Sequence, residues 1–124
     1  MATLRGGNGP DTLDGTAGDD ILYDVGGTNL LRGLGGNDQL FFESSTDAQG
    51  TLEGGDGQDS LTGGRGNDRL QGGAGNDQLY DVGGLGNLLL GEAGDDQLSF
   101  VADGSAAGTL DGGEGQDRLF AALG

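Results

Sequence analysis

Residues 54–80 read GGDGQDSLTGGRGNDRLQGGAGNDQLY, which is three consecutive nine-residue units of the form G-G-x-G-x-D-x-L-x. We number the positions of a unit from its first glycine, so that aspartate stands at position six and leucine at position eight. With substitutions, the pattern extends from Gly6 to Phe120 without a gap and makes twelve units. The leucine of position eight is present in every unit: Leu13, Leu22, Leu31, Leu40, Leu52, Leu61, Leu70, Leu79, Leu89, Leu98, Leu110 and Leu119.

The periodic leucines decide between order and disorder. With 31 glycines in 124 residues, the composition alone would suggest a disordered chain. Leucine at a fixed spacing indicates instead that each unit buries one side chain. Glycine allows the first six residues to form a tight turn, and the last three form a short strand whose middle residue points inward. Two units then make one coil, with a strand on each side and leucines meeting between them.

Eight of the twelve units keep the first and fourth glycine, the aspartate and the aliphatic residue. Among them are GGNGPDTLD (6–14), GGRGNDRLQ (63–71) and GGEGQDRLF (112–120). In this pattern the chain resembles the RTX, or haemolysin-type, calcium-binding nonapeptide family. The resemblance implies an all-β fold, a right-handed parallel β-roll (a β-solenoid) of about six coils.

A longer period lies above the nonapeptide. Units one to six (6–62) correspond to units seven to twelve (63–120), and YDVGG recurs in both, at Tyr23 and at Tyr80. We therefore expect one continuous domain built from a duplicated three-coil block, with a leader at 1–5 and a tail at 121–124. Ends this short would not cap a solenoid. They suggest an excised fragment, an engineered repeat protein or chains that associate end to end.

Composition narrows the partners. The formal charge is −16, with 21 acidic residues against five basic ones, and nucleic acid is excluded because it requires a basic surface. Without cysteine or histidine a zinc site is not expected, which leaves oxygen ligands and hard cations such as calcium. No stretch is long and apolar enough to span a membrane. Because histidine, cysteine and lysine are all missing and the acidic clusters belong to the repeat, we do not expect an enzyme.

Alternate units stack when a coil contains two units, so position six divides into two series. The even units carry aspartate throughout: Asp20, Asp38, Asp59, Asp77, Asp96 and Asp117. The odd units read Asp11, Asn29, Gly50, Asp68, Asn87 and Gly108. We call the two rows of turns the even turns and the odd turns. The even turns keep the full set of carboxylates, whereas the odd turns keep two.

The family resemblance implies calcium between the turns of adjacent coils, bound by position-six carboxylates and by glycine carbonyls. Six even turns leave five gaps, so about five ions are expected there, and one to three on the odd turns at Asp11 and Asp68. The expected carbonyl ligands are the glycines at positions one and four of the even turns: Gly15, Gly18, Gly33, Gly36, Gly54, Gly57, Gly72, Gly75, Gly91, Gly94, Gly112 and Gly115.

Other acidic residues have no such assignment. Asp19 and Asp95 precede a position-six aspartate and are expected to be solvated turn residues. The two YDVGG units lose the position-six aspartate but begin with Asp24 and Asp81. The sequence leaves open whether these two carboxylates compensate for that loss.

The function that follows is a calcium-binding module whose folding is driven or stabilised by Ca²⁺. The resemblance implies part of a secreted protein, exported by type I secretion. Alternatives are a carbohydrate-binding solenoid, to which the scattered arginines give little support, and an ice-binding or adhesin solenoid, for which no unbroken Thr/Asn row is present. A row of outward aromatic residues could cover a flank or stack on a ligand: Tyr23, Phe41, Tyr80 and Phe120, with Phe42 and Phe100 beside them.

Overall fold

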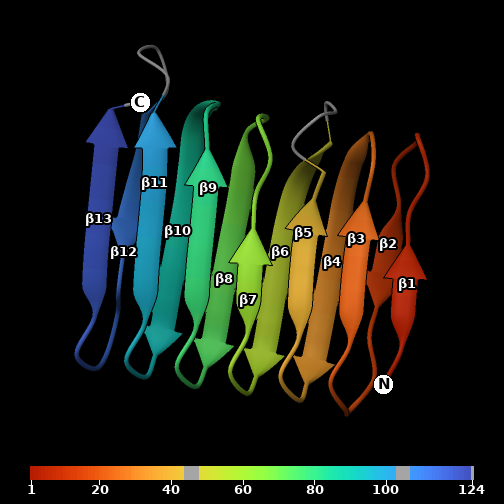
Figure 1. The fold of residues 1–124 in the computed structure, drawn as a ribbon, viewed down its shortest axis with the longest axis horizontal. Coiled ribbons are helices and arrows are strands. Elements are labelled where there is room, and N and C mark those ends of the chain that lie inside the picture. Colours follow the sequence, from red (N-terminus) through yellow and green to blue (C-terminus); the bar gives the residue numbers. More distant parts are fainter. Residues whose placement is uncertain (44–47, 103–106, 124) are drawn as a thin grey trace.

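The computed structural model describes residues 1–43, 48–102 and 107–123, and the described residues form thirteen strands in two parallel sheets (Figure 1). Sheet A contains β1 (Thr3–Arg5), β3 (Ile21–Asp24), β5 (Gln39–Phe42), β7 (Ser60–Thr62), β9 (Gln78–Val82), β11 (Gln97–Ala102) and β13 (Arg118–Leu123). Sheet B contains β2 (Thr12–Asp14), β4 (Thr28–Gly35), β6 (Gln49–Asp56), β8 (Asp68–Ala74), β10 (Leu85–Ala93) and β12 (Ala107–Asp111).

Consecutive strands alternate between the two sheets, and each strand pairs in parallel with the strand two places along the chain. The core leucines set the register, since Leu22 aligns with Leu40 and Leu31 aligns with Leu52. The chain therefore winds as a β-solenoid of about six turns, which confirms the predicted parallel β-roll. The even turns lead from sheet B to sheet A along the lower edge of Figure 1, and the odd turns lead back along the upper edge.

The core is a single stack of leucines between the two sheets. Nine of the twelve position-eight leucines are at most 1% exposed: Leu22, Leu31, Leu40, Leu52, Leu61, Leu70, Leu79, Leu89 and Leu98. Leu13 and Leu110 are partly buried, and Leu119 is 48% exposed because β13 has a neighbour on one side only. Burial of the interior leucines contributes about 1.5–3 kcal/mol each.

Two of the aromatic residues expected on the outer surface lie inside. Phe42 and Phe100 are 2% and 5% exposed, and they extend the core toward the odd turns. The reason is the strand period, since a residue two places after a core leucine points to the same side. Tyr23 and Phe41 do lie outside, where their rings stack at 5.1 Å.

Apart from β2, the strands of sheet B are longer than the three residues predicted for each unit. β4 continues from Leu31 through Gly35, because the backbone of the even turn stays paired with the next coil at Leu34 and Gly55. The terminal segments also join the sheets. Thr3–Arg5 pairs with β3, and β13 reaches Leu123 beside β11.

Position two of the even turns after the first one lies in the left-handed region of backbone conformation. Gly55, Gly73 and Gly113 hold φ values of 101°, 100° and 81° there. Leu34 and Glu92 occupy the same position with φ values of 80° and 74°, and they correspond to one another in the duplicated block. A side chain with a Cβ in this region costs roughly 1–2 kcal/mol.

We expect Leu34→Gly and Glu92→Gly each to stabilise the calcium-loaded roll by about 0.5–1 kcal/mol, because relief of the backbone conformation exceeds the added entropy of glycine. Chemical denaturation at saturating calcium measures this difference. Ala93→Gly is the matched control, since Ala93 neighbours Glu92 and has no positive φ. It should lose about 0.5–1 kcal/mol. Destabilisation by all three substitutions would contradict the assignment of strain to position two.

Candidate metal centre

The even turns are tied together by their aspartates. One carboxylate oxygen of each, Oδ1, accepts a hydrogen bond from the backbone N–H at position six of the preceding coil, at 2.7–2.8 Å. Asp20 accepts the corresponding bond from Ala2 N at 2.7 Å, so β1 supplies the start of the row. The carboxylates therefore point along the solenoid axis in register, one per coil.

The other carboxylate oxygen is left without a partner inside the protein. Oδ2 of Asp38, Asp59, Asp77 and Asp96 is buried and accepts no hydrogen bond, and these residues are at most 3% exposed. An ionised carboxylate oxygen in this situation is costly unless an opposite charge lies beside it. Four such oxygens in one row indicate a ligand rather than a local packing fault.

Glycine at position one leaves room beside each of these oxygens. A Cβ built on Gly33 would meet Asp38 Oδ2 and would lie 2.6 Å from the carbonyl oxygen of Gly54 in the next coil. A Cβ on Gly54 would meet Asp59 Oδ2 and lie 2.6 Å from Gly72 O. A carboxylate oxygen and a carbonyl oxygen thus converge beside Gly33, Gly54 and Gly91, and hard divalent cations bind such oxygen sets. The position-one glycines lie where the sequence placed them as ligands, although ligation itself stays a prediction.

The position-four glycines have a different structural duty. Gly36, Gly57, Gly75, Gly94 and Gly115 all have positive φ. A Cβ on Gly75 would collide with the carbonyl oxygen of Gly57 in the preceding coil. Close stacking of backbone therefore accounts for glycine at this position, and their role as ligands also stays a prediction.

The first even turn departs from this pattern. Position two is Thr16, whose N–H and hydroxyl both donate to Asp20 Oδ2. These bonds satisfy the oxygen that is unpartnered in the following coils and, led by the backbone bond, lower the pKa of Asp20. The gap between Asp20 and Asp38 is therefore the weakest candidate of the five.

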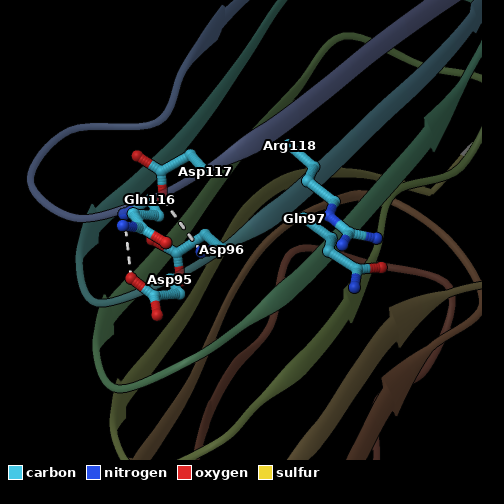
Figure 2. A pocket seen from close by; sticks show the side chains of 6 residues that line it. All are labelled: Asp95, Asp96, Gln97, Gln116, Asp117 and Arg118. Carbon is cyan, nitrogen blue, oxygen red and sulfur yellow. Dashed lines mark hydrogen bonds between the residues drawn. The ribbon is translucent and has the colours of Figure 1, made fainter.

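Figure 2 shows the last even gap, a pocket lined by Asp95, Asp96, Gln97, Gln116, Asp117 and Arg118. Asp96 N donates to Asp117 Oδ1, and Gln116 N donates to Asp95 Oδ1, both at 2.8 Å. The second bond belongs to a row at position five that the sequence analysis missed. Asp19 in the first even turn takes part as well, accepting from Asn37 N at 2.7 Å. Both Asp19 and Asp95 are exposed, as expected, but they also link neighbouring coils.

The odd turns form the same hydrogen bond along the solenoid axis, but in the second coil of each block the acceptor is an amide oxygen instead of a carboxylate oxygen. Asn29 Oδ1 accepts from Asp11 N, and Asn87 Oδ1 accepts from Asp68 N. The amide nitrogens then donate to carbonyl oxygens, Asn29 to Gly26 at 2.8 Å and Asn87 to Gly83. In these two odd turns the second side-chain group at position six is therefore a neutral amide N–H donor, whereas in four of the even turns it is an unpartnered carboxylate oxygen. Among the described residues no three acidic side chains gather as one cluster, so any ion site must rely on backbone oxygens as well.

A family profile described as the RTX calcium-binding nonapeptide repeat matches four times, at residues 3–24, 24–47, 44–79 and 104–124. The chain belongs to this RTX repeat family. No match to a curated protein is found. Membership makes the roll a calcium-binding structural module, since repeats of this family bind Ca²⁺. Within the described residues no helix is long and apolar enough to cross a membrane.

Burial changes the acidity of the central carboxyls in this RTX roll. Removal from water, followed by the charges of neighbouring aspartates, raises the pKa of Asp59 to about 6 and that of Asp77 to about 7. The same causes raise the pKa of Asp38 and Asp96. At neutral pH the calcium-free roll therefore carries charge that its own fold disfavours.

These pKa shifts predict that the calcium-free roll is more stable in acid. Because the folded-state pKa values lie above the usual 3.8, folding takes up protons, and stability is lost as pH rises from about 4 to about 7. Thermal unfolding of calcium-stripped protein, followed by circular dichroism at pH 5 and pH 8, measures the trend. The same experiment at saturating calcium should show a smaller pH dependence. A calcium-free melting temperature that rises with pH would contradict the prediction.

Proposed function

We propose that this chain is a calcium-dependent folding module of an exported protein. It remains loose where calcium is scarce and folds where calcium is abundant, as outside the cell. In the RTX family this behaviour accompanies type I secretion, and we extend that role to this chain. The module is structural, and its aspartates serve binding rather than catalysis.

The observation that carries the proposal is the row of unpartnered Oδ2 atoms at Asp38, Asp59, Asp77 and Asp96. Each would contribute a negatively charged oxygen, and the position-one glycine carbonyl of the next coil would contribute a second ligand. Oδ1 remains bonded to the backbone, which holds the carboxylate in place. Four gaps of this kind, with the Asp20 gap as a weaker fifth, support the expected count of about five ions on the even turns.

Electrostatics gives calcium a large effect on folding. The chain carries a formal charge of −16, and the roll stacks aspartates one coil apart. Self-repulsion and desolvation both oppose the calcium-free fold. Cations between the coils would remove both penalties, and a ligand that binds only the folded state stabilises it by mass action.

Asp59→Asn tests the even sites, because it should weaken folding in the presence of calcium and stabilise the roll in its absence. With calcium the substitution should lose one ion and raise the calcium concentration for half folding roughly fivefold, which corresponds to about 1 kcal/mol. Without calcium it should stabilise the roll, because an amide replaces a buried, repelled carboxylate. Asn29 and Asn87 show that the same axial bond forms with an amide. Circular dichroism during a calcium titration of calcium-stripped protein gives the calcium concentration for half folding and the degree of folding without calcium.

Asp56→Asn is the matched control, since Asp56 is exposed at position three of the same turn. It removes the same charge, and it should leave the calcium concentration for half folding and the folding without calcium nearly unchanged. Secondary structure that is unchanged from zero to ten millimolar calcium in the parent protein would refute calcium-dependent folding. An equal response of Asp56→Asn and Asp59→Asn would reduce the effect to net charge.

We also propose end-to-end association of the rolls. Leu119 and Phe120 of β13 are 48% and 61% exposed, whereas the equivalent leucines of interior strands are at most 1% exposed. β13 pairs with β11 alone and therefore presents an open edge of a parallel sheet. The edge at β1 is likewise open, with Leu4 partly buried behind it.

Analytical ultracentrifugation in calcium should show association that rises with protein concentration. Phe120→Lys should weaken it, because a charge would interrupt the apolar edge. Tyr80→Lys places the same charge on an exposed aromatic residue of an interior strand and should have no effect. A monomer at the highest concentrations of the parent protein would exclude end-to-end association.

A further inference from the structure

The odd turns contain a second arrangement of carboxylates, formed by the aspartates that begin the YDVGG units. Asp24 and Asp81 are completely buried, and Oδ2 of each accepts no hydrogen bond. Asp24 Oδ1 accepts from Gly26 N at 3.1 Å, and Asp81 Oδ1 accepts from Val82 N at 2.8 Å. Each carboxylate is thus held by its own turn while one oxygen remains free and enclosed.

Each of these carboxylates lies beside a position-one glycine together with a second carboxylate from the preceding coil, through Oδ2 for Asp24 and through Oδ1 for Asp81. A Cβ built on Gly6 would collide with Asp24 Oδ2 and would lie 2.9 Å from Asp11 Oδ2. A Cβ built on Gly63 would lie 2.7 Å from Asp81 Oδ1 and 3.0 Å from Asp68 Oδ2. Glycine at position one of the first coil in each block therefore leaves a space into which two carboxylates of consecutive odd turns converge.

Backbone donors orient the second partner of each pair. Gly7 N donates to Asp11 Oδ2 at 2.7 Å, and Gly64 N donates to Asp68 Oδ2 at 3.0 Å. Asp68 also accepts from Gly50 N at 3.0 Å and is only 3% exposed. No arginine takes part in a salt bridge with these four residues among the described parts of the chain. Asp11 is only partly buried, but Asp24, Asp68 and Asp81 are buried, and buried negative groups need a counter-charge.

Within the described residues, the column of side chains at position one separates the coils that bring two carboxylates together from those that do not. Along the odd turns it reads Gly6, Asp24, Phe42, Gly63, Asp81 and Phe100. In the third coil of each block the phenylalanine occupies the interior, and a Cβ on Gly108 would lie 3.4 Å from the Phe100 ring. The amides of Asn29 and Asn87 already satisfy carbonyl oxygens in the second coil. In the part of each block that the structure describes, one such space therefore remains on the odd side, between the first and second coils.

We propose that Asp11 with Asp24, and Asp68 with Asp81, form two dicarboxylate sites for a divalent cation such as Ca²⁺. This inference rests on the proposed calcium-dependent function and adds a chemically distinct class of site to it. At an even gap a position-one glycine lies beside one carboxylate, whereas at an odd site it lies beside two. A larger ligand charge strengthens cation binding, so the odd pair fills before the even row during a titration.

The test uses the whole chain and the double variant D24N/D81N. Native mass spectrometry at saturating calcium should show two fewer bound ions than in the parent protein, with the first ions of the titration missing. The control D56N/E114Q removes the same charge from two exposed residues and should keep the parent count. Circular dichroism at saturating calcium checks that each variant is folded.

A second measurement leaves the carboxylates intact. Crystals of the parent protein grown with Tb³⁺ should give anomalous peaks beside Gly6 and Gly63, in addition to those along the even turns. Peaks along the even turns alone, or an unchanged ion count in folded D24N/D81N, would overturn the two odd sites and would mean that the paired carboxyls share protons instead. If the parent protein retains no calcium at all, the proposed function fails, which is a separate outcome.

Discussion

The fold depends on a hydrogen bond that runs along the solenoid axis, from the backbone N–H at position six of one coil to a carboxylate or amide oxygen at position six of the next. Asp38, Asp59 and Asp77 form an unbroken run of such bonds on the even turns. Using one oxygen for this bond places the second oxygen inside the stack, where the protein has no donor for it. The bond that aligns the coils therefore also creates the demand for a cation.

The two rows of turns meet this demand differently. On the even turns the unpartnered oxygen recurs coil after coil beside a position-one glycine, with the first coil satisfied by Thr16 instead. The odd turns of each block contain three different arrangements in chain order. These are a pair of carboxylates, an amide that donates to carbonyl oxygens, and a buried phenylalanine. YDVGG thus marks the coil in which the carboxylate moves from position six to position one. The second block repeats the same three arrangements in the same order.

Stability and binding are coupled through the same charges. The core receives one position-eight leucine from each unit, and Leu13 and Leu110 near its ends are only partly buried. Burial raises the pKa of Asp59 and Asp77, two of the carboxyls that would bind ions, so protons and cations compete for the same oxygens there. A roll of this kind responds to both acidity and calcium, because either removes charge from between the coils.

Much of this architecture could be predicted from the nonapeptide pattern, because a leucine at every position eight leaves one way to bury all of them. The two rows of turns and the complete even row of aspartates follow from spacing, and the resemblance to the RTX family supplied the parallel β-roll. The roles of Asp24, Asp81, Phe42 and Phe100 did not, because they depend on which residues stack above and below each one. Gly6 and Gly63 have no side chain to indicate that they lie beneath a carboxylate. Local spacing determines the repeat, and only the stacking of coils 18 to 21 residues apart decides what meets inside it.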